Sequence, residues 1–287
     1  MIKQRVIRKS KNQKKPLPKL YFFLAILTFA TFIGSSAHIF MAGNPDNFVS
    51  FYSNLANPYM KYVYISPGLR REEVAHTFQK ALSWSPTQVR EFLEAAPKDD
   101  RGSLDGYYMP GKYWVEKGAT GKAVAKQMID NFNNTVSKKV IASKGTNPFN
   151  QKINIDTAVR IASIIQREAA GKHDMRLISG IIWNRMFKGM KLEMDATLQY
   201  AKASSTDWWP MVQGKDKYID SPFNTYQNKG LPPIAIANPG LDAILAAINP
   251  QKTDCLFYIH DKNRNIHCEK EYSEHKANVE KYLIGRK

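Results

Sequence analysis

The pattern of hydrophobic and polar residues changes character several times along the chain. Residues 20–42 form an apolar stretch without a single Asp, Glu, Lys or Arg. An α-helix needs about 20 mainly apolar residues to cross the hydrocarbon core of a bilayer, so this stretch predicts one transmembrane helix. A cleaved signal peptide is the alternative, because Ser35-Ser36-Ala37 resemble a cleavage site. The stretch is, however, longer than the usual apolar core of about 7–15 residues in such peptides.

The charges that precede this stretch predict its orientation. Residues 1–19 carry eight Lys and Arg and no acidic residue, and such an excess holds a flanking segment in the cytoplasm. We therefore expect an uncleaved signal anchor that crosses the inner (plasma) membrane once. The N-terminus would be cytoplasmic, and everything after Asn44 would lie on the periplasmic or extracytoplasmic side.

The positive charge continues beyond the leader, but it is diluted. The formal net charge of the chain is +17, of which the leader supplies +8 and the remainder +9. No cluster of interleaved aromatic and basic residues occurs, so nucleic acid is not expected as a partner. An anionic or zwitterionic polymer of the cell envelope suits this charge better, although an ordinary solvated surface also explains most of it.

Strand and helix patterns follow the apolar stretch. Residues 62–65 alternate like a strand, and the apolar residues of 74–82 recur at helical spacing. Ser85-Pro86-Thr87-Gln88 combine an N-cap, a proline at the first helical position and a Gln three residues after the cap, which predicts a second helix. This strand–helix–helix unit has the size of modules that grip glycan chains, and a purely structural module explains it equally well.

Cys255 and Cys268 bracket a predicted hairpin, with LFYIH as its first strand and DKNRN as its turn. An oxidising envelope permits a bridge, but the hairpin register decides whether the two side chains meet. A bridge and two free thiols therefore both remain open. His267, Glu271 and His275 are spaced four apart, but the first falls on a strand, so we expect no metal site.

One carboxyl falls on the apolar face of a helix. The helix predicted over residues 157–170 has Asp156 as its N-cap and Gly171 just after its end. Glu168 lies three positions after Ile165, on the same face. Burial disfavours the charged form, so its pKa should rise towards the range of a general acid. The alternatives are that the last turn frays and exposes Glu168, or that Glu168 pairs with an Arg.

An arginine and a long loop complete the residues of interest. In the helix predicted over residues 177–190, Arg185 follows the apolar Ile181 by four positions. A buried Arg needs an anion, so Arg185 is the expected partner of Glu168 or of the ligand. Residues 221–240 are irregular and rich in Asn, Thr, Tyr, Gly and Pro, which is typical of long loops that line binding sites.

Four segments, in this order, resemble the endolytic murein transglycosylase family, also called the MltG or YceG-like family. LDGYYMPGKYWV resembles its EGYLFPDTY element, and IASIIQREA resembles its ASIVEKET helix, whose second Glu is catalytic and aligns with Glu168. WNRMFKGMKLEMDATLQYA resembles NRLxxGMxLQTDPTVxY, and SPFNTYQNKGLPPIAIANPG resembles SPYNTYxxxGLPPGPIxNPG. The resemblance extends from Tyr62 to Tyr282.

The chain also departs from the family pattern. Gln166 stands where the family has its first Glu in the catalytic helix, which leaves Glu168 as the only carboxylate there after Asp156. Glu193 occupies a position where an amide is usual. The C-terminal HxF element reads His267-Cys268-Glu269, so its aromatic residue is missing.

The resemblance implies a lytic transglycosylase that cleaves the β-1,4 bond between N-acetylmuramic acid and N-acetylglucosamine within peptidoglycan strands. Glu168 would be the single acid and base, and the muramoyl C6 hydroxyl would close onto C1 to give a 1,6-anhydro end. Ordinary glycosidases need two carboxylates instead. No cofactor is expected, and the expected partners are peptidoglycan glycan strands and peptidoglycan synthases. The predicted substrate-binding residues are Gln166, Arg185, Glu193, Asp195, Thr197, Asn224, Thr225 and Tyr226.

The implied fold class is α+β, with a single N-terminal transmembrane helix, a small LysM-like module and a mixed α/β catalytic domain. The expected segments are a cytoplasmic basic leader (1–19), a transmembrane signal anchor (20–42), a linker (43–61), the LysM-like module (62–103), a connecting segment (104–150) and the catalytic domain (151–287).

Two other functions remain compatible with the sequence. A non-catalytic peptidoglycan-binding anchor would keep the module but not Glu168, whose presence argues against it. A muramidase-type hydrolase would need a second carboxylate near the scissile bond, which Asp195 or Glu193 would supply.

The topology can be tested by cysteine labelling in intact cells. Because the leader is basic and the next stretch is apolar, a cysteine introduced before Lys19 should be shielded from a membrane-impermeant reagent. A cysteine introduced shortly after Asn44 should react. Labelling at the first position, or release of a soluble mature form, would contradict the anchor.

Overall fold

The computed structural model describes residues 53, 55, 57–137 and 153–284. The expected leader, anchor and most of the linker lie outside these residues. The chain divides into two compact units, Met1–Pro58 and Tyr59–Lys287, and the account below concerns the second. None of the helices in the described ranges is long and apolar enough to cross a membrane.

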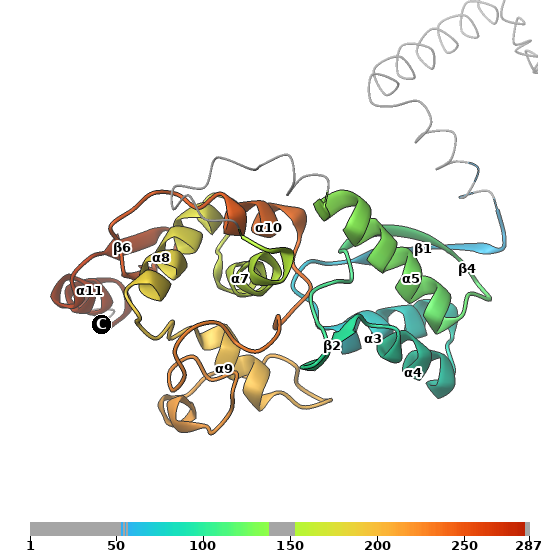
Figure 1. Cartoon of the computed structure of the whole chain (residues 1–287), viewed down its shortest axis with the longest axis horizontal. Coiled ribbons are helices and arrows are strands. Elements are labelled where there is room, and N and C mark those ends of the chain that lie inside the picture. The colour runs from blue at the N-terminus through green and yellow to red at the C-terminus, as the bar shows by residue number, and fades with distance from the viewer. Residues whose placement is uncertain (1–52, 54, 56, 138–152, 285–287) are drawn as a thin grey trace, which may run out of the picture. The chain divides into compact units, whose positions relative to one another are not determined.

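The first part of this unit is a strand–helix–helix–strand arrangement (Figure 1). Strand β1 (Met60–Ile65) pairs antiparallel with β4 (Gly111–Glu116), and helices α3 (Arg71–Leu82) and α4 (Pro86–Glu94) lie between them in the chain. The short strands β2 (Lys98–Asp99) and β3 (Gly102–Ser103) form a separate hairpin. The predicted cap of the second helix is confirmed, because the side chain of Ser85 accepts from Gln88 N and the Gln88 side chain accepts from Ser85 N.

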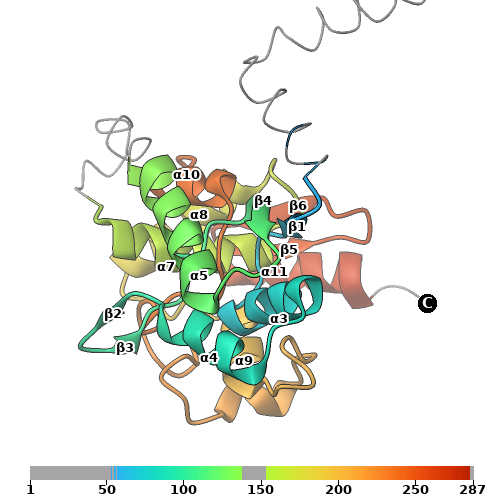
Figure 2. The ribbon, with the colours of Figure 1, turned by 90° about the vertical axis from the view of Figure 1, so that its right-hand side faces the viewer.

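An aromatic core fills this part. Phe78, Phe92 and Tyr108 are buried, and the Phe92 and Tyr108 rings stack with centroids 4.6 Å apart. Helix α5 (Gly121–Phe132) contributes its buried face to the same core and lies against α4 (Figure 2), before the short π-helix η1 (Asn133–Ser137). The boundary expected at residue 103 therefore falls inside one continuous core.

The second part is mainly helical and is built around α7 (Ile155–Glu168). Helix α7 packs against α8 (Met175–Phe187), α9 (Asp195–Lys202) and α10 (Leu241–Ile248) (Figure 1). The short 3-10 helix η2 (Gly214–Tyr218) lies between α9 and the long loop, and the chain continues into β5 (Phe257–His260), β6 (Ile266–Glu269), α11 (Tyr272–Val279) and η3 (Glu280–Ile284). Helices and antiparallel strand pairs together confirm the α+β class.

The start of α7 differs from the prediction. Asn154, not Asp156, is the N-cap, and its side chain accepts from Thr157 N at 2.7 Å. Asp156 instead pairs with Arg101 and Arg160, each at 3.0 Å. The sequence pattern could not show this, because Arg101 comes from a distant part of the chain. The helix ends at Glu168, so Gly171 lies beyond its cap.

Asn238 joins the two parts. Its main-chain N–H donates to the Leu69 carbonyl and its own carbonyl accepts from Gly68 N, both at 2.8 Å. Its side-chain oxygen accepts from Tyr108 N and its amide donates to Leu69 O, both at 3.0 Å. Asn238 is fully buried, so water does not compete for these bonds.

The predicted C-terminal hairpin is confirmed, and the structure decides the cysteine question. Strands β5 and β6 are antiparallel, with Tyr258 opposite Cys268. Cys255 and Cys268 form a disulfide with their Cα atoms 5.7 Å apart. Both cysteines of the chain are therefore used to close the hairpin that carries Tyr258.

The close approach of α4 and α5 predicts a sharp substitution effect. A Cβ atom at Gly121 would lie 1.9 Å from the Gln88 carbonyl oxygen and 2.7 Å from Phe92 N. Because backbone atoms cannot move aside easily, Gly121→Ala should lower the free energy of unfolding by about 2–3 kcal/mol. Denaturant unfolding of the full chain, followed by tryptophan fluorescence, measures this change.

Gly118 provides the matched control, because a Cβ atom there meets nothing within 4 Å. Gly118→Ala should change the free energy of unfolding by less than about 0.5 kcal/mol. Equal effects at the two positions would contradict the packing of α5 on α4.

Candidate active site

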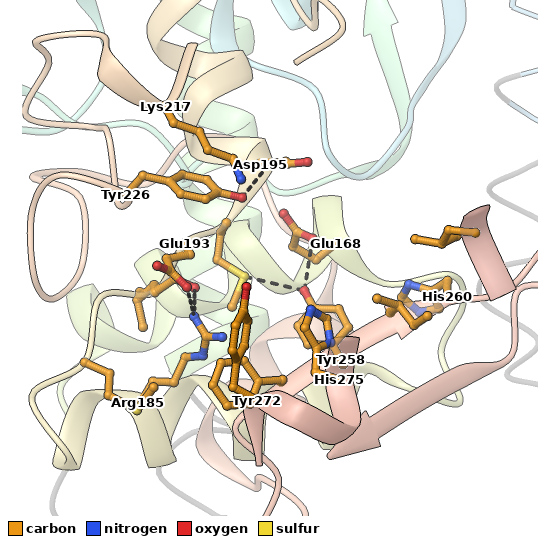
Figure 3. Close-up of a pocket in the computed structure, with 16 residues that line it drawn as sticks. Glu168, Arg185, Glu193, Asp195, Lys217, Tyr226, Tyr258, His260, Tyr272 and His275 are labelled. Atoms are coloured by element: carbon orange, nitrogen blue, oxygen red, sulfur yellow. Dashed lines mark hydrogen bonds and ion pairs between the residues drawn. The ribbon is translucent and has the colours of Figure 1, made fainter. Parts of the chain in front are cut away.

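A pocket of about 870 Å³ lies beside the end of α7 (Figure 3). Five predicted site residues meet there, namely Glu168, Arg185, Glu193, Asp195 and Tyr226. The complete lining is Glu168, Arg185, Met190, Leu192, Glu193, Met194, Asp195, Lys217, Tyr226, Phe257, Tyr258, Ile259, His260, Tyr272, His275 and Leu283.

Glu168 is the last residue of α7, and two donors fix its carboxyl group. The main-chain N–H of Ala196 donates to Oε1 at 3.1 Å, and the Tyr258 hydroxyl donates to Oε2 at 3.0 Å. These donors belong to the first turn of α9 and to β5. Three segments that are far apart in the sequence therefore meet at one carboxyl group, and Figure 3 shows its bond to Tyr258.

Burial raises the pKa of the Glu168 carboxyl, and the nearby charge of Asp195 adds to this rise. The two hydrogen bonds act in the opposite direction, because they stabilise the carboxylate. Burial also raises the pKa of Tyr258 well above its usual range, and the neighbouring Glu168 raises it further. Tyr258 therefore stays protonated and able to donate.

Arg185 does not pair with Glu168, so the expectation that these two residues are partners was wrong. Arg185 is only 6% exposed. Its guanidinium pairs with Glu193 at 3.1 Å, and its Nε donates to the Leu256 carbonyl at 2.6 Å. Glu193 has a left-handed backbone, with φ at 54°. Residues with a side chain adopt this conformation only where the surroundings enforce it, and residue spacing did not reveal it.

Asp195 presents a second carboxylate to the pocket. It is the first residue of α9 and is exposed, and its Oδ1 accepts from the Tyr226 hydroxyl at 2.7 Å. Lys217 Nζ lies 4.8 Å from the centroid of the Tyr226 ring. Tyr226 thus joins the long loop to α9 at the rim of the pocket.

Thr197 and Thr225, which were predicted to bind substrate, are not among the lining residues. Their hydroxyl oxygens are 2.9 Å apart, and both residues are buried. Met194 N donates to Thr225 Oγ1 at 3.0 Å, and Glu193 N donates to the Thr225 carbonyl at 3.1 Å. These threonines hold the segment that carries Glu193 and Asp195 against the long loop.

Asn224 and Gln166 have a similar supporting position behind the pocket. The Asn224 side chain accepts from Tyr226 N at 2.9 Å and donates to the Ile219 carbonyl at 2.8 Å. Gln166 Oε1 accepts from Gly240 N at 3.0 Å, which ties α7 to the end of the same loop. Both side chains organise residues 221–240 without reaching the lining.

The sequence patterns indicate no substrate-binding or catalytic role for the residues that the C-terminal segment adds to the pocket, and His275 occurs only in a spacing that was rejected as a metal site. These residues include Tyr258 and His260 from β5 and Tyr272 and His275 from α11. His260 Nε2 lies 2.8 Å from a carboxylate oxygen of the buried Asp174. No local motif marks these residues, because their approach to Glu168 depends on how the hairpin folds back.

The polar side chains of the pocket are suited to proton transfer. Within the described ranges, no group of three or more His, Cys, Asp or Glu side chains is arranged to hold a metal ion. The pocket contains one carboxyl group with a raised pKa, fixed at both oxygens and open to a ligand. Such a group can give a proton to a leaving atom and take one back.

Comparison with known proteins shows the family of this chain. Residues 44–281 match the YceG-like family. The endolytic murein transglycosylase of Bacillus subtilis (strain 168) is 34% identical over 190 residues, which cover 66% of this chain and 51% of that protein. The enzyme of the same name from Streptococcus pneumoniae serotype 2 (strain D39) is 28% identical over 211 residues, which cover 71% of this chain and 37% of that protein.

A solved structure supports the same relationship. The crystal structure of a yceG-like protein from Listeria monocytogenes superposes with a TM-score of 0.64 at 25% identity, covering 82% of this chain and 81% of that one. The chain spans about half, or less, of the length of the curated relatives that it matches. The family match extends over most of the chain and includes every residue that lines the pocket except Leu283. The chain therefore belongs to the YceG-like family.

Proposed function

We propose that this protein is a membrane-anchored lytic transglycosylase that cleaves peptidoglycan strands internally. The bond broken is the β-1,4 bond between N-acetylmuramic acid and N-acetylglucosamine, and the product carries a 1,6-anhydro end. Family membership and the activity for which the relatives are named support this proposal. The observation that carries it is the carboxyl of Glu168, which two donors hold in the pocket and whose pKa burial raises.

Glu168 performs both proton transfers in this proposal. The protonated carboxyl first gives its proton to the glycosidic oxygen as the bond to C1 breaks. The carboxylate then takes the proton of the muramoyl C6 hydroxyl, whose oxygen bonds to C1. The enzyme ends in its starting protonation state, and no water is consumed. The acetamido group of the substrate stabilises the charge that develops at C1.

The surroundings of Glu168 stabilise both its protonated and its deprotonated form. Burial favours the protonated acid before bond cleavage, and the Ala196 N–H and the Tyr258 hydroxyl stabilise the carboxylate that follows. The Arg185–Glu193 pair and the Tyr226–Asp195 pair supply charged and polar groups on the walls, where they orient the sugars.

The parts outside the pocket complete the proposal. The arrangement of β1, α3, α4 and β4 supports a LysM-like module that grips the glycan. The basic leader and the apolar residues 20–42 support a single-pass anchor, with the catalytic part outside the inner membrane. A position beside peptidoglycan synthases follows from a role in ending nascent strands.

Asp195 keeps a second function open, namely a muramidase-type hydrolase. It is an exposed carboxylate in the same pocket, and its charge acts on Glu168. In a hydrolase it would act as nucleophile or as base for a water molecule. The two functions differ by one water molecule in the mass of the product ends.

Purified glycan strands therefore test the function and the role of Glu168 together. The wild-type chain should produce 1,6-anhydro ends, which mass spectrometry identifies as lighter than reducing ends by one water. Glu168→Gln keeps the size of the side chain but removes proton transfer, which typically contributes about 10²–10⁴-fold. The variant should lose nearly all cleavage.

Glu94→Gln is the control, because Glu94 is an exposed carboxylate on α4. It should cleave like the wild type. Reducing ends from the wild type would favour the hydrolase. Near-normal turnover by Glu168→Gln would remove Glu168 from the mechanism and direct attention to Glu193 or Asp195.

The pH dependence offers a separate test. The acid form of Glu168 is required, so activity should fall as the pH rises through the raised pKa of this carboxyl. The Tyr258 hydrogen bond lowers that pKa, so Tyr258→Phe should move the alkaline limb of kcat/KM to higher pH. Tyr218→Phe, at an 81% exposed tyrosine, should leave the limb in place. An unchanged limb in Tyr258→Phe would contradict the proposed role of the hydrogen bond.

The raised pKa of Glu168 also determines how the stability of the folded protein changes with pH. The folded-state pKa of Glu168 lies above its unfolded value, so the folded protein binds more protons between the two values. Stability from this group is present below the unfolded pKa and is lost as the pH rises through the folded pKa. At a pH above both values, Glu168→Gln should therefore melt at or above the wild-type temperature.

A further inference from the structure

Arg167 is a partly buried arginine near the end of α7. It precedes Glu168 in the last turn of α7, and its guanidinium lies 3.7 Å from the centroid of the Trp209 ring. No carboxylate of the described residues forms an ion pair with it, and its Nε is buried without a hydrogen-bond partner. By contrast, Arg185 pairs with Glu193 and Arg71 with Asp105.

The Trp209 ring is held firmly in place. Its indole N–H donates to a carboxylate oxygen of Glu73 on α3 at 2.9 Å. The guanidinium of Arg70 also lies near this ring, at 4.7 Å, and near the Tyr200 ring, at 4.0 Å. The platform under Arg167 is therefore held in place by two residues of the first part of the unit, Glu73 and Arg70.

The other side of Arg167 faces the turn that follows β1. A Cβ atom at Gly68 would lie 3.5 Å from Arg167 Cδ and 3.6 Å from its Nη1. Gly68 has φ at +89°, a backbone conformation that suits glycine. The turn thus approaches the arginine without a side chain that could compete for its N–H groups.

A half-buried guanidinium without an ion-paired anion is costly, because the Trp209 ring and the charges of Glu73 and Glu168 offset only part of its desolvation. Burial lowers the pKa of Arg167, but a guanidinium remains protonated in proteins. The planar N–H fork matches a carboxylate with two parallel hydrogen bonds. A ligand that supplies a carboxylate beside the Glu168 pocket would therefore complete the site.

We infer that Arg167, resting on Trp209, forms a subsite for a carboxylate of the peptide attached to the glycan strand. The inference rests on the proposed function, because peptidoglycan carries such carboxylates on the peptides that branch from its muramoyl residues. A strand that places one bond at Glu168 extends beyond the pocket. The branch next to that bond then reaches the N–H groups of Arg167.

The test compares three forms of one strand preparation: untreated strands, strands with carboxylates converted to amides by carbodiimide and ammonia, and strands without peptides. The last form keeps only the lactyl carboxylate. Binding is measured with the full-length chain carrying Glu168→Gln, so that strands stay intact. The chain with Arg167 intact should bind untreated strands roughly five- to tenfold tighter than amidated ones, as expected for one charge-assisted contact.

Arg167→Gln should abolish this preference, and Arg167→Lys should keep part of it, because the charge remains but the planar fork is lost. Arg176→Gln, at an exposed arginine of α8 outside the pocket lining, should keep all of it. A purely structural role would weaken binding to untreated and amidated strands equally and would overturn the inference. If the peptide-free strands bind as tightly as the untreated strands, and Arg167→Gln weakens that binding, the subsite takes the lactyl carboxylate. That outcome would also overturn the inference.

Cleavage by the wild-type chain separates this inference from the proposed function. If the wild type releases no anhydro ends, the proposed function fails. The binding comparison still decides whether Arg167 binds a carboxylate of the strand. If the wild type cleaves and Arg167→Gln keeps the preference for untreated strands, the subsite is wrong and the function stands.

Discussion

The packing of α7 among α8, α9 and α10 determines where the reactive carboxyl lies. Ile161, Ile164 and Ile165 are fully buried in this core, and close-packed interiors leave a helix little freedom to shift. Glu168 follows directly on this fixed turn. Its carboxyl therefore enters the pocket at a defined place, and the core that α9 shares positions Ala196 N as its donor. The raised pKa is a consequence of that packing, because the same atoms that hold the helix exclude water from the carboxyl.

Buried polar side chains shape the irregular walls. Residues 221–240 lack regular backbone pairing, so side chains satisfy their main-chain groups, as buried polar groups require. Asn224 and Thr225 supply such bonds, and Thr197 joins them to α9. These residues and the carboxylates thus have separate tasks: the first set fixes the shape of the pocket, and the second supplies its chemistry. A polar motif in the sequence does not by itself distinguish the two.

The parts of the fold that rest on local patterns could be predicted, and those that rest on distant contacts could not. The Ser85 cap and the apolar face that carries Glu168 depend on residues within one or two turns, and the structure has both. The N-cap of α7 is Asn154 and not the predicted Asp156, whose carboxylate instead pairs with two arginines. The partner of Arg185 depends on a left-handed backbone at Glu193. The donor Tyr258 is delivered by a hairpin that folds back from the end of the chain.

The position of Asn238 has a consequence for how the molecule comes apart. Four hydrogen bonds converge on this one buried residue, and they join the segment before α3 and the segment before β4 to the loop that precedes α10. Separating the two parts breaks all four bonds together and leaves their groups without partners in a dry interior. These four hydrogen bonds therefore form and break together. We therefore expect the strand–helix–helix–strand part and the pocket-bearing part to unfold in one cooperative transition. A destabilising change in either part would then lower the stability of both.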